Sequence, residues 1–327
     1  MKLPAIKDFK LNAVLFKDLR QKTKRSQLSV SVFLLNLFLS LIAIIILLSV
    51  SFSAASYSPL DNTVFTVFFI VLGFMEFGFI LLTVPAVTSG AITMEREKQT
   101  FDVLLTTSLT TRQIIWGKYW ASLAQVILLI ISGFPVFALV FMYGGVTFFQ
   151  AFGVLLTLLL LTMYISAIGL FFSAKMKKTI VATVLTYVIL LVLMFGTISM
   201  LLTAGGIIEV INSIVLDNTG VDPDLKIDFL GFILYVNPLC TIYDCMAGLF
   251  NFDSFIFGSD ATMAGILSDV THFSSNNILL TLWTPISIVV QMLIAWGALE
   301  RASVVIDPLR KKADKYARKR KRNKQAA

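Results

Sequence analysis

The sequence predicts an all-α membrane protein with six transmembrane helices. Hydrophobic residues make up 57% of the chain and charged residues only 14%, whereas soluble domains carry about a quarter charged residues. Six apolar runs reach the roughly 20 residues that cross the hydrocarbon core of a bilayer. The basic residues fall almost entirely into the two terminal segments and every second connection between these runs. Together these features exclude a soluble globular domain.

The six candidate spans divide the chain into a membrane domain and two flanking segments. The spans cover residues 28–51, 64–92, 114–143, 148–174, 180–203 and 278–299. The second and third are longer than a crossing requires, so we expect tilt or projecting ends. We therefore expect a cytoplasmic amphipathic segment over 1–27, a transmembrane domain over 28–299 with an external segment at 204–277, and a basic cytoplasmic tail over 300–327.

Charge predicts the orientation of the spans. Of the 27 Lys and Arg residues, all except Lys226 lie on one side of a six-span arrangement, in the two terminal segments and the connections after spans two and four. Cytoplasmic loops accumulate Lys and Arg. We expect a multi-pass plasma-membrane protein with both termini cytoplasmic. Because the positive charge, +8 in total, accompanies apolar spans, it indicates membrane topology and not a nucleic-acid partner.

Both cytoplasmic ends are suited to contact lipid. An apolar helix face predicts a helix lying along the inner membrane interface; its residues are Phe9, Leu11, Leu15, Phe16 and Leu19. The basic run at 318–322 fits either binding to anionic lipid or a simple topology anchor.

The external segment combines two apolar stretches. Residues 207–217 have helical amphipathic spacing and predict a short helix at the outer interface. Residues 229–250 are apolar but interrupted by Asn237 and Pro238. A pair of re-entrant helices before the last span is the favoured interpretation, because a seventh span would place the basic tail outside. A spanning helix stays the alternative.

A short helix is predicted in the connection between spans two and three. Phe101, Leu104 and Leu105 recur at helical spacing, and Thr110 with Gln113 has the spacing of a capping box that begins the next helix. Such a short apolar ridge cannot form a core of its own. It could lie on lipid, pack under the bundle or fit a groove on a cytoplasmic partner.

Residues 85–118 resemble the ABC-2 family of transporter permeases. The shared features are a proline at the end of span two, the Glu95-Arg-Glu97 triplet, Thr100, the Leu104-Leu105 pair, and Gly117-Lys118 entering span three. The family often has a proline in the turn where this chain has Ser108, which leaves the backbone of that turn less certain.

The resemblance implies an exporter built from two permease copies, identical or different, each docking a coupling helix on a cytoplasmic ABC ATPase. The residues implied at that interface are Glu95, Glu97, Thr100, Phe101, Leu104, Leu105 and Thr107. Closure of the ATPases around ATP would rock the permeases between inward and outward states.

The chain has no phosphate-binding loop of its own. Gly117-Lys118 lacks the first glycine and the Ser or Thr of the G-x-x-x-x-G-K-[ST] pattern. We therefore expect a transport subunit that is not an enzyme, with ATP and Mg²⁺ bound by the partner. One histidine, His272, and two cysteines, Cys240 and Cys245, leave no material for a metal site.

A few polar residues within the spans are candidates for the translocation path. Glu76 is the one acid deep in a span, and Asn36 and Gln125 are the polar residues that could accompany it. All three could instead make packing hydrogen bonds. Pro85 and Gly90 are candidate hinges, or a fixed kink.

Three other functions compete with a transport subunit. An ion-driven secondary transporter would need more intramembrane charges and repeated halves, and an intramembrane enzyme would need a nucleophile with its base. A membrane scaffold or immunity protein is the third. The sequence does not define the transported substrate.

Overall fold

The computed structural model describes residues 26–55, 62–106, 109–142, 146–219, 228–250 and 282–307. Every regular element in these ranges is helical, and six helices are long and apolar enough to cross a membrane. The chain is thus an all-α, multi-pass membrane protein, as the sequence predicts. Three predicted parts lie outside the described residues: the N-terminal interfacial helix, the part of the external segment after residue 250, and the basic tail.

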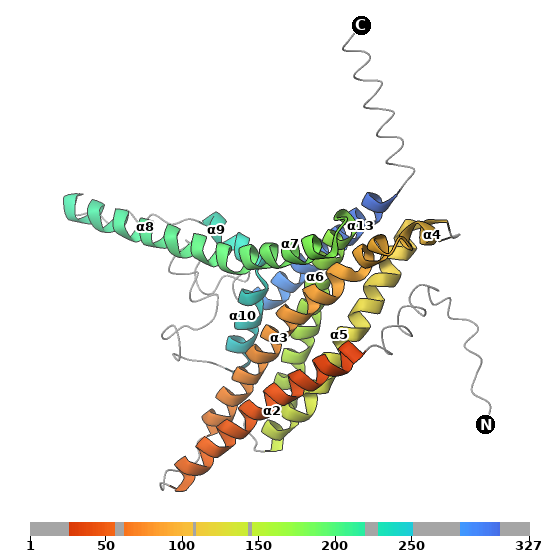
Figure 1. The fold of residues 1–327 in the computed structure, drawn as a ribbon. Helices are drawn as coiled ribbons and strands as arrows, with labels where there is room; N and C mark the ends of the chain where they lie inside the picture. The colour runs from red at the N-terminus through yellow and green to blue at the C-terminus, as the bar shows by residue number, and fades with distance from the viewer. Residues whose placement is uncertain are drawn as a thin grey trace.

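The helices follow the predicted spans closely in order and position. They are α2 (Ser26–Ala55), α3 (Asn62–Glu97), α4 (Phe101–Leu105), α5 (Thr111–Met142), α6 (Phe148–Lys175), α7 (Thr179–Leu191), the π-helical segment η1 (Val192–Gly196), α8 (Thr197–Thr219), α9 (Asp228–Ile233), the 3-10 turn η2 (Leu234–Val236), α10 (Pro238–Phe250) and α13 (Trp283–Ile306). The last span is displaced toward the C-terminus, because α13 continues to Ile306. Figure 1 shows the axes of α2, α3 and α5 sloping in a similar way, with the chain reversing its direction from α2 to α3 and again to α5.

Helix α6 forms the centre of the bundle and packs closely against α3. A Cβ built on Gly169 of α6 would lie 2.0 Å from Oγ1 of Thr88 on α3. The Ser173 hydroxyl of α6 accepts hydrogen bonds from the backbone N–H of Ile92 (2.9 Å) and of Thr93 (3.2 Å). Small and hydroxyl side chains allow this approach, as is common where membrane helices pack without a hydrophobic driving force.

Helix α3 continues without interruption through both candidate hinge residues, Pro85 and Gly90. Pro85 has no N–H to donate to the preceding turn, which leaves a carbonyl there without its helical partner. The hydroxyl of Tyr187 on α7 donates to the nearby carbonyl of Leu82. The carbonyl freed by Pro85 is that of Leu81, so the Tyr187 contact joins α7 to α3 beside the proline without replacing the lost bond.

The fifth span is longer than the sequence predicts. Helix α7, η1 and α8 form one continuous helical run from Thr179 to Thr219, so the predicted amphipathic helix at 207–217 is not a separate element but continues the fifth span. A glycine weakens a helix by about 1 kcal/mol. In an apolar medium, losing the backbone hydrogen bonds costs more than that, so Gly205 and Gly206 do not end the helix.

In residues 228–250, the described part of the segment before α13, two short helices are present, and neither is long enough to cross a bilayer. Helix α10 has 13 residues, or about 20 Å of helix, against a hydrocarbon core of about 30 Å. The break between η2 and α10 falls at Asn237, as the sequence suggests. Both η2 and α10 contact α13, and α10 also packs on α6.

Helix α8 extends away from the bundle beyond its contact with α9 (Figure 1). Its apolar side chains are largely exposed, with Ile207 60% and Leu202 69% accessible. Such a surface needs lipid or another protein to cover it.

Candidate functional site

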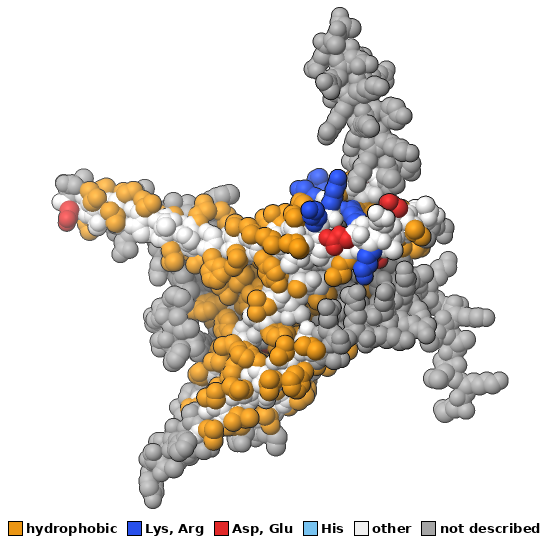
Figure 2. Space-filling view, viewed as in Figure 1, with side chains coloured by type: hydrophobic (Ala, Val, Ile, Leu, Met, Phe, Trp, Pro, Cys, Tyr) orange, Lys and Arg blue, Asp and Glu red, His pale blue; other side chains and the backbone are white. Residues whose placement is uncertain are grey.

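Basic and acidic side chains gather at one end of the bundle (Figure 2). This basic end is defined by the end of α3, helix α4, the beginning of α5, the turn between α6 and α7, and the end of α13. Its exposed basic residues are Lys98, Arg112, Lys175, Lys177, Lys178 and Arg301. The remainder of the described bundle surface is mainly apolar, which matches a lipid-facing wall ending at this charged rim.

Glu95 connects α3 with α5 through an ion pair. Its Oε1 lies 2.7 Å from Nζ of Lys118, whose side chain is only 2% exposed. A lysine buried among helices requires a carboxylate partner, and Glu95 supplies it from the neighbouring helix.

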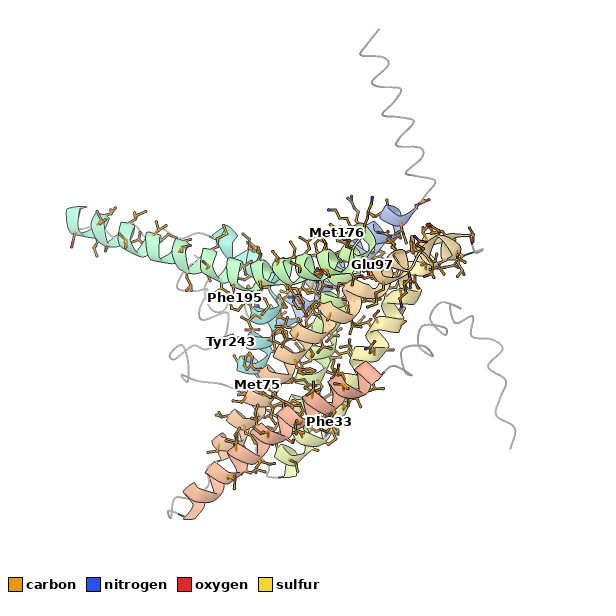
Figure 3. The ribbon with its side chains drawn as sticks, in the orientation of Figure 1. Phe33, Met75, Glu97, Met176, Phe195 and Tyr243 are labelled. Atoms are coloured by element: carbon orange, nitrogen blue, oxygen red, sulfur yellow. The ribbon has the colours of Figure 1, made fainter. Side chains whose placement is uncertain are left out.

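Arg96 and Glu97 hold the turn between α6 and α7. The Arg96 guanidinium donates to the carbonyl of Met176 at 2.6 Å. The Glu97 carboxylate accepts from the backbone N–H of Thr179 at 2.7 Å and from its hydroxyl at 2.9 Å. Figure 3 shows Glu97 close to Met176. Because Thr179 is the first residue of α7, the Glu97 carboxylate lies at the positive end of that helix and satisfies a free N–H there.

Helix α4 is folded back onto the end of α3. The chain reverses at Gln99, which has a positive φ of 57°, and the N–H of Thr100 donates to the carbonyl of Glu95 at 2.9 Å. The Phe101 ring is buried, with the Arg96 guanidinium 5.0 Å from its centre. Phe101 therefore fixes α4 to the bundle instead of lying on its outer surface.

The outward surface of α4 consists of Asp102, Val103 and Thr106. Val103 is 68% exposed, whereas Leu104 and Leu105 are half-buried. Of the expected interface residues, Glu95 and Glu97 anchor neighbouring helices, Thr100 is exposed at the turn, and Thr107 lies outside the described residues. Sequence reasoning did not select Val103.

The beginning of α5 has the predicted capping box. The N–H of Thr110 donates to Oε1 of Gln113, and the N–H of Gln113 donates to the Thr110 hydroxyl. The adjacent Arg112 pairs with Glu300 of α13 at 2.6 Å. Helix α4 contacts the end of α3, which is in turn bound to α5 through Glu95 and to α7 through Glu97.

The candidate path residues lie in the packing between α2, α3 and α5. Glu76 is completely buried, and Gln125 is half-buried on α5. Asn36 donates to the Ser132 hydroxyl at 3.1 Å and to the carbonyl of Val32 at 2.9 Å. Neither of these Asn36 hydrogen bonds goes to Glu76.

A second polar cluster lies where the short helices meet the π-helical segment. The Asn237 amide donates to the carbonyl of Met194 at 2.9 Å and to the hydroxyl of Thr197 at 2.8 Å. Gln291 of α13 donates to the hydroxyl of Thr241 at 2.7 Å. A π-helical turn leaves carbonyls poorly paired, and Asn237 satisfies one of them. This cluster fixes the short helices to α13 and to the long α7–α8 helix.

Neither cluster contains the elements of a metal site. Within the ranges that the structure describes, no group of three His, Cys, Asp or Glu side chains could hold a metal ion. The interactions at the basic end are ion pairs and helix caps. They link neighbouring helices, so a movement of one helix displaces the next.

The comparisons with known proteins support the same family. A family model described as "ABC-2 family transporter protein" matches residues 75–299. The matched range begins within α3, includes α4 to α10, and ends at Leu299 of α13. A search of curated proteins gives no match.

Proposed function

The chain belongs to the ABC-2 family of transporter proteins, and from that premise we propose that it is the transmembrane permease subunit of an ATP-binding-cassette exporter. It forms the translocation path in the plasma membrane with its basic end and both termini in the cytoplasm. A separate cytoplasmic ATPase binds ATP and Mg²⁺ and docks on α4. The chain itself catalyses no reaction.

The attachment of α4 is the observation that carries this proposal. A docked ATPase moving α4 would move the end of α3, because Thr100 and Phe101 hold the two together. The ion pair to Lys118 and the bonds from Glu97 to Thr179 would carry the displacement into α5 and α7. Short hydrogen-bonded links between rigid helices are the physical form that such coupling requires.

A second permease completes the proposed assembly. Helix α8 leaves exposed apolar side chains beyond the bundle, including Val210 and Ile214 at 57% and 54%. Apolar exposure on this scale suits lipid on one side and a partner helix on the other. The partner is either a second copy of this chain or a related permease.

Replacing Val103 with arginine tests the docking surface. We expect recovery of the ATPase with the affinity-purified chain to fall about tenfold, because a charged side chain in the centre of an interface costs more than about 1.4 kcal/mol. Ile180→Arg is the matched control, since Ile180 is 77% exposed and also lies at the basic end. Equal ATPase recovery with both variants would contradict docking on α4, provided both insert into the membrane.

A further inference from the structure

Glu76 is a buried acid without a partner. Its side chain has no exposed surface, and neither carboxylate oxygen has a hydrogen-bond partner in the part of the chain that the structure describes. It lies on α3 next to Met75, which Figure 3 labels in the middle of the helix. Buried carboxylates are normally hydrogen-bonded or paired, so an exception requires a physical account.

The neighbouring helices close tightly around this carboxyl group. A Cβ built on Gly133 of α5 would lie 3.2 Å from Glu76 Oε1 and 3.4 Å from Cδ1 of Leu39 on α2. One residue before Gly133, the Ser132 hydroxyl accepts from Asn36, so the nearby α2 amide is already engaged. Glycine at 133 leaves space for the Glu76 carboxyl group and for little else.

Among the described helices packed around it, none turns a charge toward Glu76. Helix α2 contains no titratable residue, and the last titratable residue of α5, Tyr119, precedes Gly133 by 14 positions, or about 21 Å of helix. On α6 and α7, Tyr164 and Tyr187 donate to backbone carbonyls. The Asp244 carboxylate of α10 accepts a hydrogen bond from the Thr284 hydroxyl. The other charged residues of α3 and α6 lie at the basic end: Glu95, Arg96, Glu97 and Lys175.

We propose that Glu76 is a proton-binding site and that the closed packing of α2, α3 and α5 is its proton-bound state. An ionised carboxylate in apolar surroundings costs several kcal/mol unless water or a cation reaches it. A proton satisfies the carboxyl group without needing a counter-charge from a neighbouring helix. A conformation that opens α2 from α5 would wet the carboxyl group and release the proton to water. Acid therefore favours the closed packing, and alkaline pH favours the open one.

Infrared absorption of the purified full-length chain tests the bound proton directly. At neutral pH we expect a carbonyl-stretch band of a protonated carboxyl group that Glu76→Gln removes and Glu76→Asp retains at a shifted position. Identical carboxyl bands in the native chain and in Glu76→Gln would overturn the proposal. Glutamine has nearly the same shape as the protonated acid, so we expect the variant to fold.

Cross-linking of α2 to α5 tests the conformational part. Asn36→Cys with Ser132→Cys places two thiols where an amide and a hydroxyl are 3.1 Å apart, in a chain with Cys240 and Cys245 replaced by alanine. At each pH, the disulfide yield of this chain is divided by the yield of the same chain carrying Glu76→Gln. Because pH changes thiol reactivity equally in both chains, the ratio removes that effect. We expect this ratio to fall as pH rises. A constant ratio would show that the packing does not depend on the Glu76 proton.

Discussion

Replacing Glu95 with glutamine is expected to lower the free energy of unfolding by about 3–5 kcal/mol, because it removes the carboxylate that neutralises a buried lysine. Lys118 is 2% exposed, and its ammonium nitrogen lies 2.7 Å from the Glu95 carboxylate. Loss of a charged partner from a buried ammonium group is strongly destabilising. The measurement is the thermal unfolding midpoint of the detergent-solubilised chain.

Two further variants separate the buried charge from other causes. Glu95→Gln combined with Lys118→Met should recover most of the lost stability, since no buried charge then remains. Glu300→Gln is the matched control, because the Arg112–Glu300 pair is close but its side chains are 60% and 36% exposed. Exposed pairs contribute less than about 1 kcal/mol. An equal effect of Glu95→Gln and Glu300→Gln would show that the Glu95–Lys118 pair is not buried as described.

Replacing Gly169 with valine is expected to separate α3 from α6 and to lower the unfolding midpoint strongly. Even the first carbon of the new side chain would lie 2.0 Å from Thr88 Oγ1 and 3.1 Å from Thr88 Cβ. Overpacking of this kind costs about 1–3 kcal/mol or more in a well-packed interior. Because α3 carries α4, the same change should reduce recovery of the partner ATPase.

Alanine variants provide a graded test of this contact. Gly169→Ala should be destabilising, whereas Gly78→Ala on α3 meets no atom within 4 Å and should be nearly neutral. Adding Thr88→Ala to Gly169→Ala should restore part of the loss, since it removes the closest atom. Equal midpoints for the two single alanine variants would contradict the close approach of α3 and α6.

Features that depend on local sequence could be predicted, and those that depend on distant contacts could not. The spans follow from hydropathy, and the capping box at Thr110 follows from residue spacing, and both are confirmed. The ion pair between Glu95 and Lys118 joins separate helices. Its one signal is a lysine at position 118 within an apolar helix, where a charge needs a partner.

The inward orientation of Phe101 also required the structure. A five-residue helix is too short for its pattern of apolar and polar residues to show which side is buried. The neighbouring Arg96 decides this, because its guanidinium lies over the ring. For the same reason, the exposed Val103 could not be distinguished by sequence from the half-buried Leu104.

Photo-cross-linking from position 103 tests most directly whether α4 docks on an outside motor. A photoreactive amino acid replaces Val103 and is activated in intact cells. The control carries the same amino acid at Leu82, a lipid-facing position of similar exposure (66%). The account predicts a cross-link from position 103, and none from position 82, to a protein whose sequence contains the G-x-x-x-x-G-K-[ST] loop. Cross-links from position 103 to lipid alone, or its labelling by a reagent confined to the cell exterior, would contradict the account.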